Sequence, residues 1–254
     1  MTGSEGFRFA DDPLADPVFG TPASGTAGGQ PGAAAVCRAV VKTYRTATES
    51  VTALDGVTCA IPRGQVTVVV GPSGSGKSSL LRLLACIDRP DDGEVLIADE
   101  RVDRLGARAR RKLRQRQVAY LFQRPGENLL PYLDATAQVR LAAQLRGAAV
   151  TDADVQDLLD RLGLGDRADH HPRQLSGGEQ QRLAVACGVV GDPALVVADE
   201  PTAELDTAAA ERVLVAMEEL AAGGVGFVIS SHDPRVMAIA DGFLRLDHGR
   251  VVDG

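Results

Sequence analysis

Short apolar runs alternate with stretches of helical periodicity along most of the chain. Four of these runs have the length of a single strand: residues 66–70, 118–122, 195–198 and 225–230. An apolar run without polar alternation is typical of a strand buried on both faces, and helical stretches between such strands favour parallel pairing. The pattern therefore predicts an α/β domain with a mostly parallel sheet.

Two further β-branched runs precede this series. Residues 36–41 and 57–61 lie on either side of a polar stretch, 45–52, and predict a strand-loop-strand arrangement. We therefore expect an N-terminal antiparallel β-layer in addition to the parallel sheet.

Leucine spacing and the gaps between the expected strands predict where the helices lie. Leucines at helical spacing predict a helix over residues 78–87, and a late helix is expected over 207–222, before a hairpin-like end at 243–251. Between residues 133 and 162 the periodicity is helical and no buried strand is expected. This predicts a helical insertion of about 124–190.

The first 34 residues differ from the rest in composition. They are rich in Gly, Ala, Pro, Thr and Asp and have almost no apolar periodicity, so they cannot bury enough surface to offset the entropy of ordering. The remaining residues, 35–254, have ample apolar content for one core, because the 254-residue chain is 44% hydrophobic. We expect a flexible tail, 1–34, followed by one principal domain.

Charge and cysteine content narrow the class of protein. With 27 Lys and Arg against 34 Asp and Glu, the formal net charge of -7 argues against nucleic acid as the main partner. The cysteines Cys37, Cys59, Cys86 and Cys187 have no spacing typical of zinc or a redox pair, and they are expected to be buried free thiols. Neither a secretory signal nor an apolar run near the ~20 residues of a membrane span is expected.

A glycine-rich loop follows the 66–70 run. The string Gly71-Pro72-Ser73-Gly74-Ser75-Gly76-Lys77-Ser78 matches a phosphate-binding loop in its required strand-to-helix context. Glycines let successive backbone N–H groups wrap phosphate oxygens, and the following helix adds the positive end of its dipole. Lys77 is expected to pair with the β- and γ-phosphates, and the Ser78 hydroxyl to coordinate Mg²⁺. The alternative, an ordinary glycine-rich turn, does not account for the Gly-Lys-Ser ending.

A pair of carboxylates ends a later strand. Residues 195–198 lead directly into Asp199 and Glu200, at the carboxyl end of a strand, where doubly wound sheets place ligand groups. Asp199 is expected to be a second Mg²⁺ contact, and Glu200 to polarise the water that attacks the γ-phosphate. Alone the pair would be a solvated turn, but the phosphate loop favours the catalytic interpretation.

A second helix start carries serine and glycines. Leu175-Ser176-Gly177-Gly178-Glu179-Gln180-Gln181 opens a helix whose N-terminus can bind an anion. A serine N-cap with two glycines is common by itself, and the complete seven-residue string is the informative signal.

These three strings resemble the ATPase domains of ABC transporters. Their order along the chain is the same: the phosphate loop, then the string that begins at Leu175, and last Leu195-Val196-Val197-Ala198-Asp199-Glu200-Pro201-Thr202. The resemblance covers about residue 36 to the end. It implies a P-loop NTPase core with an N-terminal antiparallel β-layer and a helical subdomain, and it implies ATP hydrolysis with Mg²⁺. It extends the nucleotide-binding set to the loop residues and their neighbours: Tyr44, Gly71, Pro72, Ser73, Gly74, Ser75, Gly76, Lys77, Ser78 and Ser79.

The same resemblance assigns roles to single residues that carry little signal alone. Tyr44 is similar to the aromatic residue that stacks on adenine, and Gln123 to the glutamine that contacts Mg²⁺ and the attacking water. Asp206 resembles the aspartate that crosses the dimer interface, and His232 the histidine that senses the γ-phosphate. The signature residues Ser176, Gly177, Gly178 and Glu179 would act in trans. Glu204 departs from the family, where a small residue is frequent, and it places a charge close to that interface.

The resemblance also implies partners and a mechanism. Because one chain holds one phosphate loop and one signature helix, two copies arranged head to tail could enclose two ATP molecules. The segments 120–123, 128–131 and 231–234 are similar to the lipoprotein-releasing and macrolide-exporting branch, which implies a separate membrane permease of export or mechanotransmission type and a position at the cytoplasmic face of the membrane. The alternatives are a soluble ABC-type ATPase in DNA repair, translation or cofactor assembly, and a simple P-loop NTPase or kinase.

The permease contact is expected at residues 123–145. Leu129, Leu130, Tyr132 and Leu133 form an apolar cluster between Pro125 and Pro131, in a stretch too irregular to bury all four. Such a cluster suits a docking helix of the permease. The alternative is that these side chains only pack the helical insertion against the sheet.

Overall fold

The computed structural model describes residues 32–46 and 49–252. Its strands are β1 (Ala33–Arg45), β2 (Ser50–Pro62), β3 (Val66–Val70), β4 (Asp92–Ile97), β5 (Glu100–Arg101), β6 (Val118–Leu121), β7 (Leu195–Asp199), β8 (Gly226–Ser230), β9 (Gly242–Asp247) and β10 (Arg250–Val251). Its α-helices are α1 (Lys77–Leu84), α2 (Ala107–Gln117), α3 (Ala135–Arg146), α4 (Asp152–Arg161), α5 (Gly177–Val189), α6 (Thr207–Ala222) and α7 (Pro234–Ala238). Short 3-10 turns are η1 (Pro125–Asn128), η2 (Gly165–Arg167) and η3 (Pro172–Gln174).

The larger sheet holds the strands that were expected from apolar runs. Its six strands have the order β10-β9-β3-β8-β7-β6. All neighbours pair in parallel except β10, which pairs antiparallel with β9. The predicted α/β fold with a mostly parallel sheet is therefore confirmed, including the final hairpin.

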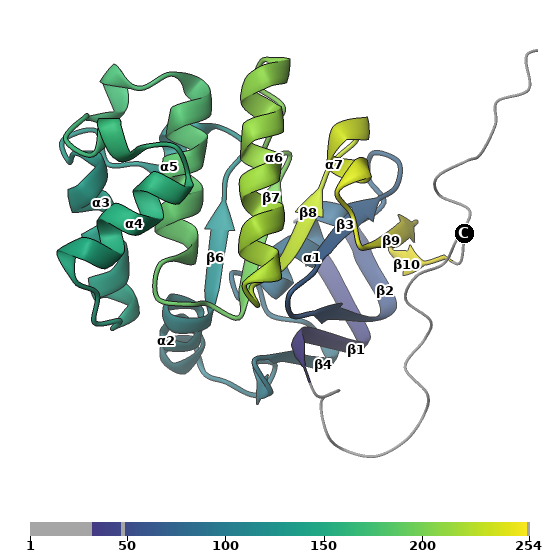
Figure 1. Cartoon of the computed structure of the whole chain (residues 1–254). Coiled ribbons are helices and arrows are strands. Elements are labelled where there is room, and N and C mark those ends of the chain that lie inside the picture. Colours follow the sequence, from purple (N-terminus) through teal and green to yellow (C-terminus); the bar gives the residue numbers. More distant parts are fainter. Residues whose placement is uncertain (1–31, 47–48, 253–254) are drawn as a thin grey trace, which may run out of the picture.

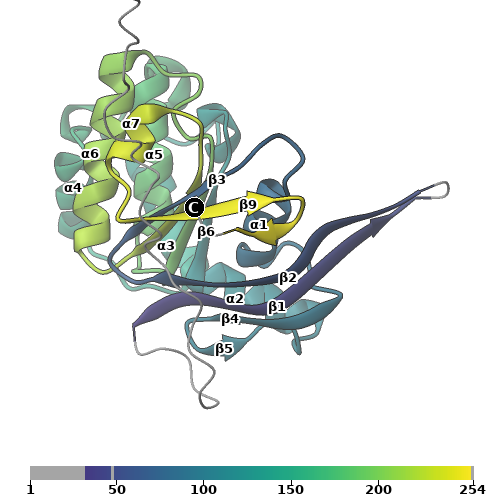
Figure 2. The same cartoon turned by 90° about the vertical axis from the view of Figure 1, so that its right-hand side faces the viewer.

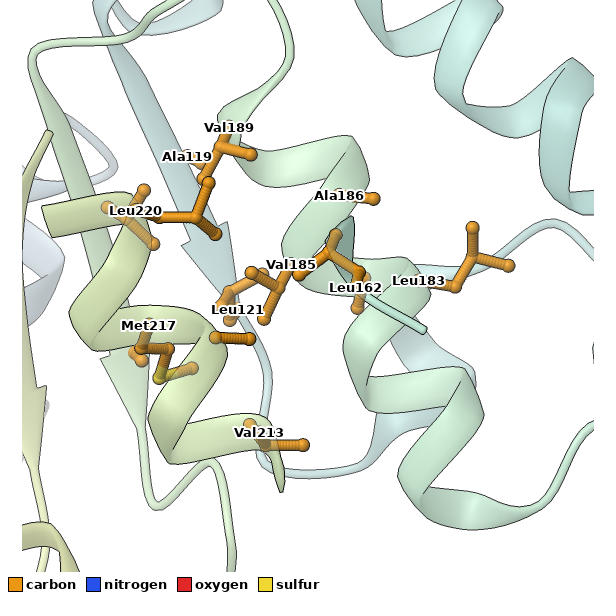
Figure 3. Close-up of a cluster of buried hydrophobic side chains, with 14 of the residues drawn as sticks. Ala119, Leu121, Leu162, Leu183, Val185, Ala186, Val189, Val213, Met217 and Leu220 are labelled. Carbon is orange, nitrogen blue, oxygen red and sulfur yellow. The ribbon is translucent and has the colours of Figure 1, made fainter. Parts of the chain in front are cut away.

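Helices and a second sheet cover the two faces of this sheet (Figure 1). Alternate residues of β3 divide between the two cores: Val66, Val68 and Val70 pack with α5 and α6, whereas Val69 packs with α1 and the antiparallel strands. Figure 3 shows part of the first core, where Leu121, Val185 and Met217 meet between β6, α5 and α6. Because both faces are covered, the strands are apolar without alternation.

The smaller sheet is the expected N-terminal antiparallel layer, with the order β2-β1-β4-β5 (Figure 2). Strands β1 and β2 have 13 residues each and are longer than the runs that predicted them. Register shifts, such as the one between Cys37 and Val40, interrupt the alternation that would have marked their full length. Strand β1 begins at Ala33, two residues inside the range expected to be tail. The rest of that prediction, residues 1–31, lies outside the described residues.

Helices α3, α4 and α5 occupy the stretch between β6 and β7 in which helical structure was expected. They form the left-hand part of Figure 1, beside α6. Helix α6 has the predicted bounds, but α1 ends at Leu84 rather than at residue 87. In the described part of the chain, no helix combines the length and apolar character that a membrane crossing requires.

Candidate functional site

The carboxyl ends of four neighbouring parallel strands bring the predicted site residues to one edge of the sheet. Val69 of β3 lies opposite Ser230 of β8, and Ser230 lies opposite Asp199 of β7. Leu121 of β6 pairs with Ala198 on the other side of β7. Since neighbouring strands are about 4.8 Å apart, the loops after β3, β8, β7 and β6 begin within roughly 15 Å of one another.

The glycine-rich loop between β3 and α1 requires its glycines. Gly71 and Gly76 have φ angles of 149° and 105°, which side chains disfavour. A Cβ at Gly71 would lie 2.1 Å from the carbonyl oxygen of Leu246, and one at Gly76 would lie 2.4 Å from that of Ala53. Lys77 Nζ donates hydrogen bonds to the carbonyl oxygens of Gly71 at 2.7 Å and Pro72 at 2.9 Å, so the ammonium group closes the loop.

Several polar groups of this loop suit a phosphate ligand. The Ser75 hydroxyl is buried and has no hydrogen-bond partner among the described residues, so it is an orphaned polar atom beside the Gly71 backbone. Ser78 is exposed at the start of α1, where backbone N–H groups lack helical partners. The loop therefore combines free donors, a helix N-terminus and one ammonium group, which together fit the phosphates of a nucleotide.

The donor set at the adjacent strand end suits Mg²⁺ rather than a metal held by protein alone. Asp199 lies at the end of β7, and its Oδ1 accepts a hydrogen bond from the Ser230 hydroxyl. Among the described residues there is no group of three or more His, Cys, Asp or Glu side chains that could hold a metal. Mg²⁺ uses one or two carboxylates together with substrate phosphates, so one Asp and one Ser beside a phosphate loop fit this ion.

Glu200 is held in a strained position directly after Asp199. Its φ angle is +47°, in a region that non-glycine residues seldom adopt and that clusters at functional sites. The Glu200 N–H donates to the carbonyl oxygen of Ser230 at 2.9 Å, and Glu200 Oε2 accepts a hydrogen bond from the Ser231 hydroxyl at 3.0 Å. These two bonds fix the backbone and the carboxylate at the sheet edge.

The loop that carries His232 is braced to the loop after Glu200. Thr202 Oγ1 donates to Asp233 Oδ2 at 3.1 Å, and Arg235 forms an ion pair with the same carboxylate at 2.7 Å. The Arg235 hydrogen bonds lower the pKa of Asp233, so this carboxylate stays charged and the brace persists at neutral pH. His232 lies between Ser231 and Asp233 with an exposed side chain.

Tyr44 lies near the end of β1, close to α1. Its hydroxyl donates to Asp88 Oδ2 at 2.8 Å, and Lys42 Nζ lies 5.3 Å from its ring centroid. Burial and then the hydrogen bond to Asp88 raise the pKa of Tyr44, while a contact with the Ser79 side chain lowers it. The ring is 37% exposed and lies near the helix that begins at the phosphate loop.

The signature segment begins α5 as expected. Ser176 is its N-cap and forms a reciprocal capping box with Glu179, whose carboxylate also binds Arg167 at 3.1 Å. Hydrogen bonds from the Ser176 N–H and hydroxyl help to lower the pKa of Glu179. Gly177 is exposed, whereas Gly178 packs against Ala209 of α6. No hydrogen bond among the described residues joins this segment to the phosphate loop.

Asp206 has a local structural role that the sequence did not reveal. Its side chain caps α6 by accepting a hydrogen bond from the Ala209 N–H at 2.9 Å. The residue is nonetheless exposed, so the carboxylate lies at the surface.

The loop after β6 is organised by an asparagine that had not been singled out. Asn128 Oδ1 accepts from the Phe122 N–H at 2.9 Å, and its amide group donates to three carbonyl oxygens of the same loop. Gln123 is exposed within this loop. The next residue, Arg124, forms an ion pair with Glu204 at 3.4 Å, so the charge at Glu204 joins the glutamine loop to the loop before Asp206.

The apolar cluster after this loop is only partly exposed. Leu129 belongs to the buried core, so the structure places it with the packing alternative. Tyr132 is 69% exposed and Leu130 36% exposed. The buried Gln138 accepts a hydrogen bond from the Leu130 N–H and donates one to the Leu133 carbonyl oxygen, which fixes the backbone that presents these two side chains.

The cysteines are free thiols in the structure, but two of them are neighbours. Cys37 of β1 and Cys59 of β2 are cross-strand partners, which their sequence spacing did not indicate. A hydrogen bond with Cys59 and, after it, burial raise the pKa of Cys37. Burial raises the pKa of Cys86 and of Cys187 to about 12.

Comparison with known proteins assigns the family. The family model described as ABC transporter matches residues 54–203, more than half of the chain. The chain belongs to the ABC transporter family. A lipoprotein-releasing system ATP-binding protein, LolD of Pseudomonas syringae pv. tomato, is 39% identical over 220 residues, which cover 85% of this chain and 96% of that relative. The chain is an ATPase of this family.

Two further comparisons agree. The macrolide export ATP-binding/permease protein MacB 1/2 of Paracoccus denitrificans is 41% identical over 217 residues, which cover 85% of this chain and 32% of that relative. This chain therefore spans about a third of the length of that protein. A dimeric ATP-binding cassette in a post-hydrolysis state, bound to ADP and Pi, superposes with a TM-score of 0.75 at 32% identity, covering 85% of this chain and 96% of that one. The predicted lipoprotein-releasing and macrolide-exporting branch is confirmed.

Proposed function

We propose that two copies of the chain close head to tail around two ATP molecules and drive a separate membrane permease. The observation that carries this proposal is the placement of two anion-binding helix starts in one chain, at Lys77 and at Ser176, with no hydrogen bond between their segments. Two copies can combine them, each phosphate loop with the other copy's signature residues Ser176, Gly177, Gly178 and Glu179. The dimeric ADP-bound cassette of similar fold supports this arrangement.

Within each copy, the phosphate loop binds the nucleotide. The backbone N–H groups of residues 73–79 contact the phosphates, and Lys77 leaves the carbonyl oxygens of Gly71 and Pro72 to neutralise the β- and γ-phosphates. Tyr44 stacks on the adenine ring from the end of β1. Ser78, Gln123 and Asp199 would hold Mg²⁺, which would neutralise the charge that develops on the phosphates.

Hydrolysis depends on Glu200 and the residues that hold it. The Glu200 carboxylate orients and polarises the attacking water, and the Ser231 hydroxyl at 3.0 Å keeps that carboxylate at the sheet edge. His232 contacts the γ-phosphate from the adjacent loop, which the Thr202 and Asp233 pair braces. Asp206 contacts the other copy across the interface while it caps α6.

The permease contact lies on residues 123–145, which comprise the loop after β6 and the start of the helical insertion of about 124–190. Gln123 shares this loop with Asn128, which ties its backbone together, so a movement of the loop reaches the Mg²⁺ site. Tyr132 and Leu130 offer exposed apolar surface next to it. Through this contact the ATPase sits at the cytoplasmic face of the membrane. The LolD and MacB relatives favour an export or mechanotransmission permease.

Co-purification with the cognate permease tests this contact. Tyr132→Glu removes exposed apolar surface without touching the core, so the domain should stay folded, hydrolyse ATP and dimerise while permease binding is lost. Val215→Asp is the matched control, because Val215 is also exposed, at 52%, but lies on α6, outside the expected contact. If Tyr132→Glu keeps its permease, or unfolds the isolated chain, the docking assignment is wrong.

A further inference from the structure

A groove runs along α6 on the side that faces α4, and we name it the α4–α6 groove. It consists of two cavities of about 510 and 400 Å³, and Arg161 at the end of α4 lines both. Leu220 and Val225 are among the residues that line the first cavity, and the second continues along α6 from Glu219 to Ala208. Figure 3 shows buried side chains between α5 and α6, including Leu162, which also lines the second cavity.

The second cavity is lined by three arginines that form no ion pair with any described residue. Arg182 of α5 is only 7% exposed, and its Nε and Nη1 atoms are buried with no hydrogen-bond partner. Arg161 and Arg212 line the same cavity and form no hydrogen bond or ion pair with any described residue. Burial and the nearby Arg212 lower the pKa of Arg182, and the more weakly acting Glu179, which pairs with Arg167, opposes this shift. A buried guanidinium group without an acceptor is costly, so this cavity is built for an anionic group that the described residues do not supply.

Acidic side chains at the rim do not fill this role. Glu211 and Glu219 line the cavity, but neither lies within ion-pair distance of any of its arginines. Glu211 instead interacts with Arg235 of α7. The remaining lining is apolar, with Leu162, Ala216 and the half-exposed Val215. A fitting occupant therefore combines carboxylates with apolar side chains.

The first 19 residues of the chain have this combination. Residues 5–19 contain Glu5, Asp11, Asp12 and Asp16 against one Arg, and three of the six phenylalanines of the chain, Phe7, Phe9 and Phe19. A tail that served only as a linker would not need aromatic residues beside acidic ones. The charge of the segment is thus complementary to that of the cavity.

The chain that joins this segment to β1 is long enough for the segment to reach the groove. A Cβ at Gly226 would lie 2.7 Å from Ala34 Cβ, so β1 begins beside the start of β8, next to Val225 of the first cavity. The 13 residues 20–32 can span roughly 43 Å, whereas the 16 residues of α6 extend only about 24 Å. We propose that residues 5–19 bind in the α4–α6 groove of their own chain, with acidic side chains on the arginines and aromatic ones on the apolar lining.

Cross-linking in the full chain tests this proposal. Cysteines introduced as Pro13→Cys and Val215→Cys should be joined by a short bismaleimide within one chain, which peptide mass spectrometry identifies. The rate should exceed that of the control pair Pro13→Cys and Lys112→Cys by about tenfold, because docking raises the local concentration of the two thiols. Lys112 is exposed on α2, away from the groove. Equal rates for the two pairs, or a cross-link between two chains, would overturn the proposal.

Charge reversal separates this occupant from a free anion. Arg161→Glu with Arg212→Glu, both at exposed positions, should slow the cross-link by roughly tenfold. Asp11→Arg with Asp12→Arg should restore it in that background, and unchanged thermal unfolding of the folded domain checks that α6 is intact. If Asp11→Asn, Asp12→Asn and Asp16→Asn together leave the rate unchanged, the arginines serve another anion and the proposal fails. The test needs neither nucleotide nor permease, so it is independent of the proposed function.

Discussion

The two glycines of the signature segment should respond differently to the same substitution. A Cβ at Gly178 would lie 2.6 Å from Ala209 Cβ, closer than real Cβ atoms approach, whereas a Cβ at Gly177 would meet only Leu205 Cδ2 at 3.6 Å. Gly178→Ala must therefore push α5 and α6 apart by roughly 1 Å, and overpacking of this kind costs about 1–3 kcal/mol. Gly177→Ala costs no packing energy and gains up to about 1 kcal/mol from helix propensity.

Thermal unfolding measures this difference. Each kcal/mol should shift the Tm by roughly 2–4 °C in a domain of this size, so Gly178→Ala should melt several degrees lower than the wild type. Gly177→Ala should melt at or above the wild-type temperature but lose ATP turnover, because its new methyl group faces the surface where the second copy's nucleotide is proposed to bind. Equal melting temperatures for the two variants would refute the close approach of α5 and α6 at Gly178.

Three other predictions concern single residues. Lys77→Ala should abolish ATP turnover mainly through weaker nucleotide binding, and near-normal ATPase activity would contradict its assigned role. Asp206→Ala should lower the free energy of unfolding by about 1 kcal/mol in urea, because the Ala209 N–H loses its cap, and Asp206→Asn should retain most of it. Cys86, which is buried and has a pKa of about 12, should react with iodoacetamide at pH 7 roughly a thousand times more slowly than after unfolding, and fast labelling of the native protein would show that this thiol is not buried.

The fold was predictable wherever burial imposed a period on the sequence. Strand β3 and helix α6 have the predicted bounds, since the first is buried on both faces and the second has one apolar face. Helix α2 was not predicted because only Leu113 of its eleven residues is buried, so its sequence carries no apolar period. The end of α1 was also missed: the chain leaves the helix through Cys86 at a φ angle of 54°, and no glycine or proline marks that turn.

The candidate site was predictable where a motif spans consecutive residues. Lys77, Asp199 and Glu200 follow from strings that encode a loop or a strand end. The roles of Asn128 and Gln138, which fix the loop after β6, were not predicted. Both side chains act through hydrogen bonds to backbone groups that only folding brings close. Ser230 and Ser231 could have been suspected, since two hydroxyls directly follow the apolar run of β8 and precede His232.

The partner of Glu204 also could not be predicted from the sequence. The sequence marked Glu204 only as a departure from the family pattern and indicated no residue that it would contact. The structure pairs it with Arg124, 80 positions earlier in the chain, across two loops that the sheet order brings together. Ion pairs between residues so far apart in the sequence depend on the topology of the fold, so no local hydrophobic period or motif predicts them.

The Glu200→Gln variant tests the central claim most directly. The amide keeps the size of the carboxylate and can still bond to the Ser231 hydroxyl, but it cannot polarise water as a carboxylate does. Size-exclusion chromatography with Mg-ATP, run beside a phosphate-release assay, should show a stable dimer that binds ATP and hydrolyses it at less than about a hundredth of the wild-type rate. A variant that hydrolyses ATP like the wild type, or that stays monomeric with saturating Mg-ATP, would contradict the account.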